Sequence, residues 1–99
     1  MASVGVVARC KVNPGSGIAV ERFFQEGLAI VEQQPLTTTW FAFRLDKTTY
    51  GVFASFAKED DRAALLSAGG PVSAKKHSEL FAEPPSCEMV DFLEVRQSR

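Results

Sequence analysis

The chain has 99 residues, of which 45% are hydrophobic and 23% are charged, and its formal net charge is -1. These values fit one domain, residues 1–99, and exclude an intrinsically disordered chain. No apolar run approaches the ~20 residues of a membrane helix, and Lys75 and Lys76 are the only adjacent basic residues. We therefore expect neither a membrane span nor a nucleic-acid partner.

The cysteines and the first residues indicate a cytoplasmic protein. Arg9 and Lys11 interrupt the apolar stretch that a signal peptide would need. Small secreted domains usually carry four or more cysteines, whereas this chain has Cys10 and Cys87. These two form no CxxC pair and lie far in sequence from the single histidine, so we expect no metal site.

The first strand and the first helix are predicted over residues 4–12 and from about residue 17 to Pro35. The segment "VGVVARCKV" is rich in β-branched side chains, "NPGSG" then forms a turn, and Ser16 is the expected helix N-cap. Gly27 within the helix indicates close packing against a sheet. One helix face carries apolar or small residues at helical spacing: Val20, Phe23, Phe24, Gly27, Leu28 and Val31.

Residues 37–56 predict a β-hairpin with its turn at residues 46–48. In the first strand Trp40, Ala42 and Arg44 share the face opposite Phe41, Phe43 and Leu45, because side chains alternate. In the second strand Tyr50, Val52, Ala54 and Phe56 lie opposite Gly51, Phe53 and Ser55. A slip of one residue changes which second-strand face joins Trp40, so both registers stay open, and both leave two apolar faces.

The rest of the chain predicts a second helix and a last strand. Residues 57–83 are expected to be helical, with an interruption at residues 69–71, acidic residues at the helix start, and Leu80 and Phe81 in the core. Pro84 and Pro85 end the helix, and "CEMVDFLEVR" (residues 87–96) is the expected last strand.

The order β-α-β-β-α-β predicts a ferredoxin-like α+β fold, with a four-stranded antiparallel sheet. Right-handed crossovers place both helices on one face. The first and last strands are then antiparallel neighbours, which brings Cys10 and Cys87 near each other as free thiols. The other sheet face stays apolar and uncovered, so we expect a homodimer.

The chain resembles the antibiotic-biosynthesis-monooxygenase-like family, through "WFAFR…YGVFASF", "KEDDRAALL" and "AEPPSCEMVDFLEV". The resemblance covers nearly the whole chain and implies a dimeric α+β barrel with a pocket between the helices and the sheet of each protomer. It also implies cofactor-independent oxidation of a phenol or quinol by O₂. Haem-degrading relatives use an Asn, a Trp and a His, of which only His77 has a counterpart here, so haem degradation ranks lower.

The candidate site follows from this resemblance. Trp40, Phe53 and Phe56 would pack a small aromatic substrate, Arg44 or Tyr50 would orient its hydroxyl group, and His77 would accept its proton. No cofactor is expected, because an electron-rich phenolate reacts with O₂ directly.

Each of these residues also has a structural interpretation. His77 stands among polar neighbours, Trp40 suits sheet packing or a dimer contact, and Arg44 suits an ion pair. The space left by Ala42, Gly51, Ala54 and Ser55 is either a pocket or is filled by Phe23, Phe24 and Phe81. The alternative function is therefore a catalytically inactive dimeric module that binds a small ligand or is associated with stress. It is supported by "FASFAKED" and "LLSAGGPVSAKKHSEL", which lack the family's usual aromatic-acid and His-Phe pairs.

Overall fold

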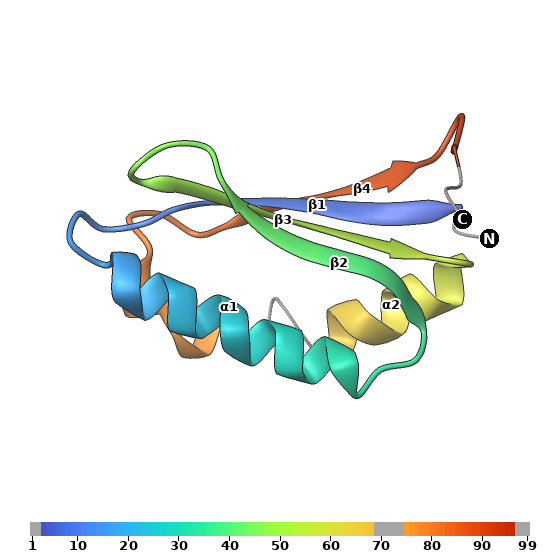
Figure 1. Cartoon of the computed structure of the whole chain (residues 1–99), viewed down its shortest axis with the longest axis horizontal. Helices are drawn as coiled ribbons and strands as arrows, with labels where there is room; N and C mark the ends of the chain where they lie inside the picture. Colours follow the sequence, from blue (N-terminus) through green and yellow to red (C-terminus); the bar gives the residue numbers. More distant parts are fainter. Residues whose placement is uncertain (1–2, 69–74, 97–99) are drawn as a thin grey trace.

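Four antiparallel strands form one sheet in the order β2-β3-β1-β4, and two helices cover one of its faces (Figure 1). The computed structural model describes residues 3–68 and 75–96. Its elements are β1 (Val4–Lys11), α1 (Gly17–Glu32), β2 (Thr37–Arg44), β3 (Thr49–Phe56), α2 (Glu59–Ala68), the short 3₁₀ helix η1 (Ser78–Leu80) and β4 (Ser86–Asp91). The expected ferredoxin-like α+β fold is confirmed.

β1 is a central strand and pairs with β3 on one side and with β4 on the other. Val6 lies opposite Ala54 of β3, and Ala8 lies opposite Cys87 of β4. The predicted antiparallel contact between the first and last strands is therefore confirmed. Cys10 and Cys87 are diagonal neighbours on the same sheet face, because Cys10 lies two residues beyond Ala8.

The hairpin register, which the sequence left open, pairs Trp40 with Ala54. Trp40 therefore shares the helix-facing side of the sheet with Val52 and Ala54, while Phe53 lies on the opposite side. In the turn, the backbone N–H of Thr48 donates a 2.9 Å hydrogen bond to Asp46 Oδ1. This bond holds the pKa of Asp46 below its ordinary value and closes the turn.

Two apolar clusters between the helices and the sheet form the core. Val20 and Phe56 are fully buried, and each such burial stabilises the fold by about 1.5–3 kcal/mol. One cluster comprises Cys10, Val12, Val20, Tyr50 and Phe81, with Phe23, Phe24 and Leu80 packed against it. The other comprises Val6, Ala54, Phe56 and Leu65, with Val4, Val31, Trp40 and Leu66. The predicted core positions Leu80 and Phe81 are confirmed.

Helix α1 approaches the sheet closely at Gly27, as expected. A methyl group at this position would lie 3.3 Å from Cζ2 of Trp40. Ser16 occupies the expected N-cap position, but its side chain makes no capping hydrogen bond. Its backbone, at φ -91° and ψ 7°, lacks the extended conformation that usually aims a capping hydroxyl at the first turn.

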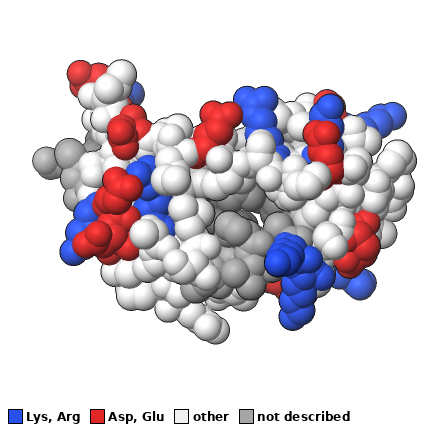
Figure 2. Space-filling model, turned by 180° about the vertical axis from the view of Figure 1, so that it is seen from behind, with Lys and Arg blue, Asp and Glu red and all other residues white. Residues whose placement is uncertain are grey.

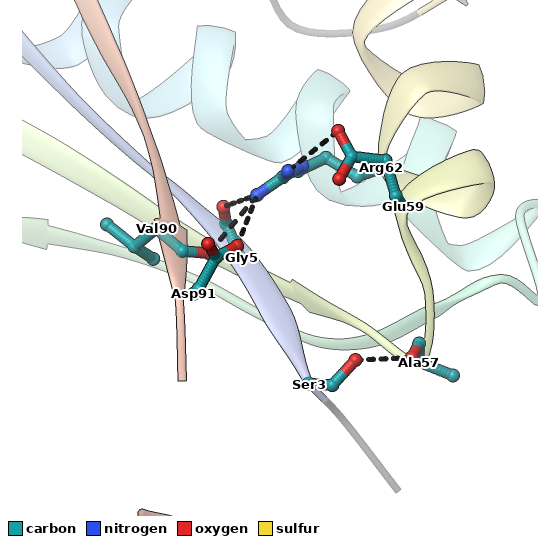
Figure 3. A network of polar contacts seen from close by, with 7 residues as sticks. All are labelled: Ser3, Gly5, Ala57, Glu59, Arg62, Val90 and Asp91. Carbon is teal, nitrogen blue, oxygen red and sulfur yellow. Dashed lines mark hydrogen bonds and ion pairs between the residues drawn. The ribbon is translucent and has the colours of Figure 1, made fainter. Parts of the chain in front are cut away.

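The buried guanidinium of Arg62 connects helix α2 to the sheet through hydrogen bonds (Figure 3). Arg62 Nη1 donates to the carbonyl oxygens of Gly5 at 3.0 Å and Val90 at 3.1 Å, and Nη2 pairs with Glu59 Oε1 at 3.0 Å. Ser3 Oγ also donates to the carbonyl oxygen of Ala57 at 2.6 Å, just before the helix. One side chain thus joins α2 to both β1 and β4.

Two predicted boundaries are wrong. The helix expected to reach residue 83 instead gives way to the 3₁₀ turn η1, and Phe81 pairs with Val12 in a β-bridge. The reason is that the N–H of Ala82 donates to Lys11 O at 2.8 Å, and that of Asn13 donates to Leu80 O at 2.9 Å. The predicted interruption at residues 69–71 and the restart near Val72 lie outside the described residues.

The last strand is also shorter than the expected residues 87–96. β4 ends at Asp91, which lies opposite Val4, the first residue of β1. The next hydrogen bond, from Phe92 N to Ser3 O, is the last between these two segments in the described chain. Strand pairing stops where the partner strand runs out.

No helix within residues 3–68 and 75–96 is both long enough and apolar enough to cross a membrane.

Candidate functional site

A cavity of about 580 Å³ lies between the helices and the sheet. Figure 2 shows the surface hollowed between these two layers. Its floor consists of small or medium side chains on the central strands, where Val6 lies opposite Ala54 and Ala8 lies opposite Val52. Because these residues are short, a ligand-sized space remains above them.

The walls of the cavity are apolar and come from both helices, from β2 and from the segment after η1. They comprise Phe23, Phe24, Gly27, Ile30, Val31, Trp40, Leu65, Leu66 and Phe81. Of the four small residues expected to leave this space, Ala54 lies in the described wall, whereas Gly51 is covered by the ring of Phe43. Phe23, Phe24 and Phe81 pack together in one core cluster and border the cavity. Rings at its edges provide apolar faces on which a flat ligand can pack.

The charged and hydroxyl-bearing residues of the described wall are few, and they come from one segment, residues 75–87. They are Lys75, Ser78, Glu83 and Ser86. Lys and Arg side chains are visible beside the hollow in Figure 2. A ligand in this cavity would thus have an apolar body and a polar group that meets this segment.

Cys10 and Cys87 both line the cavity as free thiols. Cys10 Sγ donates to the carbonyl oxygen of Tyr50 at 3.7 Å, and burial raises the pKa of both thiols. Since the thiolate is the nucleophile, both are poor nucleophiles at neutral pH. Diagonal neighbours are separated by about 7–8 Å, which is too far for a disulfide without backbone movement.

His77 lies beside the cavity and outside its wall. Its Nε2 is 3.1 Å from Glu26 Oε2 of α1, and its ring meets the edge of Phe23 at 5.7 Å between centroids. Glu26 can accept a hydrogen bond only from a protonated Nε2, so the neutral imidazole keeps Nδ1 as an acceptor. Glu79 Oε1 lies 3.9 Å from Nδ1, beyond hydrogen-bond distance.

Of the six residues predicted for the site, Trp40 is the one in the cavity wall. Tyr50 and Phe56 are buried in the two core clusters, and Arg44 is exposed at the end of β2. Phe53 lies on the opposite side of the sheet. The structure therefore does not bring the predicted constellation together around this cavity.

Sequence reasoning missed the contributions of β1 and of the end of the chain. Val6, Ala8 and Cys10 alternate along β1, and Ser86 and Cys87 begin β4. The alternation in β1 was visible in the sequence as a period of two. It could not be assigned to a face until the partner strands were known.

The sheet face away from the helices carries a row of neighbouring aromatic rings, which we call the aromatic face. Phe41 lies 5.4 Å from Phe53 and 6.0 Å from Phe43, and Phe53 lies 6.0 Å from Phe92, between ring centroids. Phe41 remains 49% exposed in the single chain. An exposed aromatic patch of this kind is typical of a protein interface.

Comparisons with known proteins place the fold. No family model and no curated protein matches this chain. The crystal structure of NE2512 from Nitrosomonas europaea, a protein of unknown function, is 30% identical, with a TM-score of 0.87 over 100% of this chain and 97% of that chain.

Two further structures are more distant in sequence. A Caulobacter crescentus protein, provisionally named an antibiotic biosynthesis monooxygenase, is 23% identical, with a TM-score of 0.77 over 94% of this chain and 92% of that one. SnoaB from Streptomyces nogalater, a cofactor-independent oxygenase solved as its N63A mutant, is 19% identical, with a TM-score of 0.79 over 94% of this chain and 95% of that one. The chain thus belongs to one family with NE2512, and its resemblance to the antibiotic biosynthesis monooxygenases is confirmed at the level of the fold.

Proposed function

We propose that this protein is a homodimeric, cofactor-independent monooxygenase that oxidises a small aromatic substrate with O₂. The observation that carries the proposal is the apolar cavity of about 580 Å³ beside Trp40. Protein interiors are normally close-packed, and unfilled space lowers stability. A cavity of this size in a 99-residue chain is what a ligand site requires.

An aromatic substrate suits the cavity because rings border it on several sides. Trp40, Phe24 and Phe81 offer apolar faces and edges to a flat ligand. A phenol or quinol that loses its proton becomes electron-rich enough to transfer electrons to O₂, so the protein needs to bind the substrate, orient it and help it to ionise. The likeness in fold to SnoaB supports this choice of chemistry.

His77 is the proton acceptor in this proposal. Glu26 holds its Nε2, which leaves Nδ1 as the basic atom. In sequence His77 lies between Lys75 and Ser78, which both line the cavity, and this adjacency supports its role as the acceptor. His77→Gln should reduce turnover of a phenol at least tenfold while ligand affinity is kept, and full activity in this variant removes His77 from the mechanism.

The dimer would form through the aromatic face. On this face Phe41 is exposed and Phe43 and Phe53 are half-buried in the single chain, and pairing two such faces would bury all three rings. A cytoplasmic location completes the proposal, since two free cysteines without a disulfide framework are typical of proteins in a reducing compartment.

The direct test is oxygen uptake with a panel of phenols and hydroquinones, followed by mass spectrometry of products formed under ¹⁸O₂. Ala8→Leu places a larger side chain on the cavity floor and should abolish turnover. Ala29→Leu makes the same change on an exposed position of α1 and should leave turnover intact. No oxygen uptake with any substrate, or equal uptake by Ala8→Leu, contradicts the proposal.

A second function is favoured by the scarcity of reactive groups in the described wall. The thiols there are protonated at neutral pH, and His77 lies outside the wall. A dimeric module that binds a small ligand without changing it needs no more than the apolar cavity. The two functions are distinguished by incubating the protein with a phenol that binds and then measuring the mass of the ligand by native mass spectrometry. The binding module releases the phenol with its mass unchanged.

A further inference from the structure

The charged residues at the cavity differ in the sign of their charge and in whether they already have an ion-pair partner. Lys75 and Glu83 line the cavity, together with Ser78 and Ser86 of the same segment. Lys75 has no ion-pair partner among the residues that the structure describes. His77, the neighbouring basic group, already faces Glu26 and Glu79. Lys75 is therefore the cation of the described wall that is free to meet a ligand.

This matters because an apolar cavity opposes the ionisation of a phenol. Transfer of a phenol into apolar surroundings disfavours its charged form and raises its pKa. The floor and walls, built from residues such as Val6, Val52, Phe24 and Leu65, offer no charge that compensates for this effect. A positive charge near the phenol oxygen has the opposite effect and lowers the pKa.

We propose that Lys75 is the anion-binding residue of the cavity and holds the ionised oxygen of a bound phenol. In this step the O–H bond of the phenol breaks, the electron pair stays on the oxygen and the proton passes to Nδ1 of His77, the acceptor of the proposed function. Ser78 and Ser86 also line the cavity and carry hydroxyl groups that can donate further hydrogen bonds to a bound oxygen. The inference rests on the proposed function in that the ligand is a phenol, and it specifies the group that the cavity recognises.

Glu83 provides an internal check on this assignment. Its carboxylate also lines the cavity, and a negative charge there disfavours a second anion. Neutralising Lys75 and neutralising Glu83 should consequently have effects of opposite sign on the ionisation of the same ligand. A role of Lys75 that is merely structural does not predict this opposition.

The test is a spectrophotometric pH titration of 4-nitro-1-naphthol, whose ionised form absorbs at longer wavelength, free and bound to the whole protein. The wild-type protein should lower the pKa of the bound phenol by about one unit relative to the free phenol. Lys75→Met should remove this shift, Glu83→Gln should enlarge it, and Lys76→Met, at an exposed position outside the wall, should leave it unchanged.

The methyl ether of the same naphthol, which cannot ionise, separates this inference from the proposed function. If the ether binds but the wild-type protein does not lower the pKa of the phenol, the role of Lys75 is overturned and the cavity remains a ligand site. A shift that persists in Lys75→Met also overturns the role of Lys75. If neither the ether nor the phenol binds, both the inference and the proposed function fail.

Discussion

The two faces of the sheet differ in what lies over their small residues. On the helix side, short residues such as Ala8 and Ala54 leave a cavity. On the aromatic face, rings cover the positions that have no side chain, since Phe43 lies over Gly51 and Phe92 lies over Gly5. Small residues thus create space on one face and receive aromatic rings on the other. This difference is the basis for the proposed ligand site on the helix side and for the proposed dimer contact on the aromatic face.

The largest expected effect on stability comes from removing the hydrogen bonds that join helix α2 to the sheet. Arg62→Met keeps most of the side-chain volume but removes the hydrogen bonds to the carbonyl oxygens of Gly5 and Val90. We expect the free energy of unfolding to fall by about 2–3 kcal/mol, because these bonds have a charged donor. Urea unfolding measures the change. Arg22→Met, at an exposed position of α1, is the control and should change stability little.

A methyl group added at Gly51, under the aromatic face, should lower the free energy of unfolding by nearly as much. The methyl group of the Gly51→Ala variant would overlap Cζ of Phe43, so the ring must leave its place. Overpacking of this kind lowers the free energy of unfolding by about 1–3 kcal/mol. A thermal unfolding scan reads the loss. Unchanged stability in Gly51→Ala would mean that Phe43 does not need the glycine beneath it.

The proposed dimer should dissociate when a charge is placed on the aromatic face, and it should persist when the same charge is placed on the helix side of the sheet. Phe41→Asp places a charge among the neighbouring rings, and we expect it to convert a dimer into a monomer. Met89→Asp is the matched control, since exposed Met89 lies opposite Val6 on the helix side of the sheet. Sedimentation velocity at micromolar concentration compares the two, and a monomeric wild-type protein contradicts the assignment of this face.

The smallest effect on stability is expected at Gly27. Alanine there brings a methyl group to 3.3 Å from Trp40 Cζ2, which the ring can relieve by a small shift. Alanine also favours the helix by about 1 kcal/mol, so the net change in stability should be close to zero. Because Trp40 is the only tryptophan, its fluorescence should report the shift of the ring. An unaltered emission spectrum would show that Gly27 does not set the position of Trp40.

The sequence was sufficient for the element order and for the placement of both helices on one face. Helical spacing from Val20 to Val31, the turn at Asp46 and the right-handed crossovers all act over short range or by general rules. The end of β4 was not predictable in this way, because it depends on where β1 runs out opposite Asp91. The buried position of Arg62 had no local signal, since an arginine between acidic and alanine residues is typical of an exposed helix.

The residues of the candidate site were harder to predict, because the sequence does not reveal the hairpin register or how deeply each side chain is buried. Trp40 was expected at the site and lies in the wall, while Phe53 and Phe56 differ from it in face and in burial. Register is a long-range property, and hairpin alternation alone does not reveal it. Lys75 appeared in the sequence as one of two adjacent surface lysines, and only the fold distinguishes it from Lys76 as a residue of the cavity wall.

Titration of the protein with 2-naphthol, followed by the fluorescence of Trp40, shows whether the space beside Trp40 is a ligand site. We expect saturable quenching in the wild-type protein, and its loss in Ala8→Leu, where the added side chain occupies the floor of the cavity. Quenching that does not saturate, or that is equal in the two proteins, would contradict this expectation.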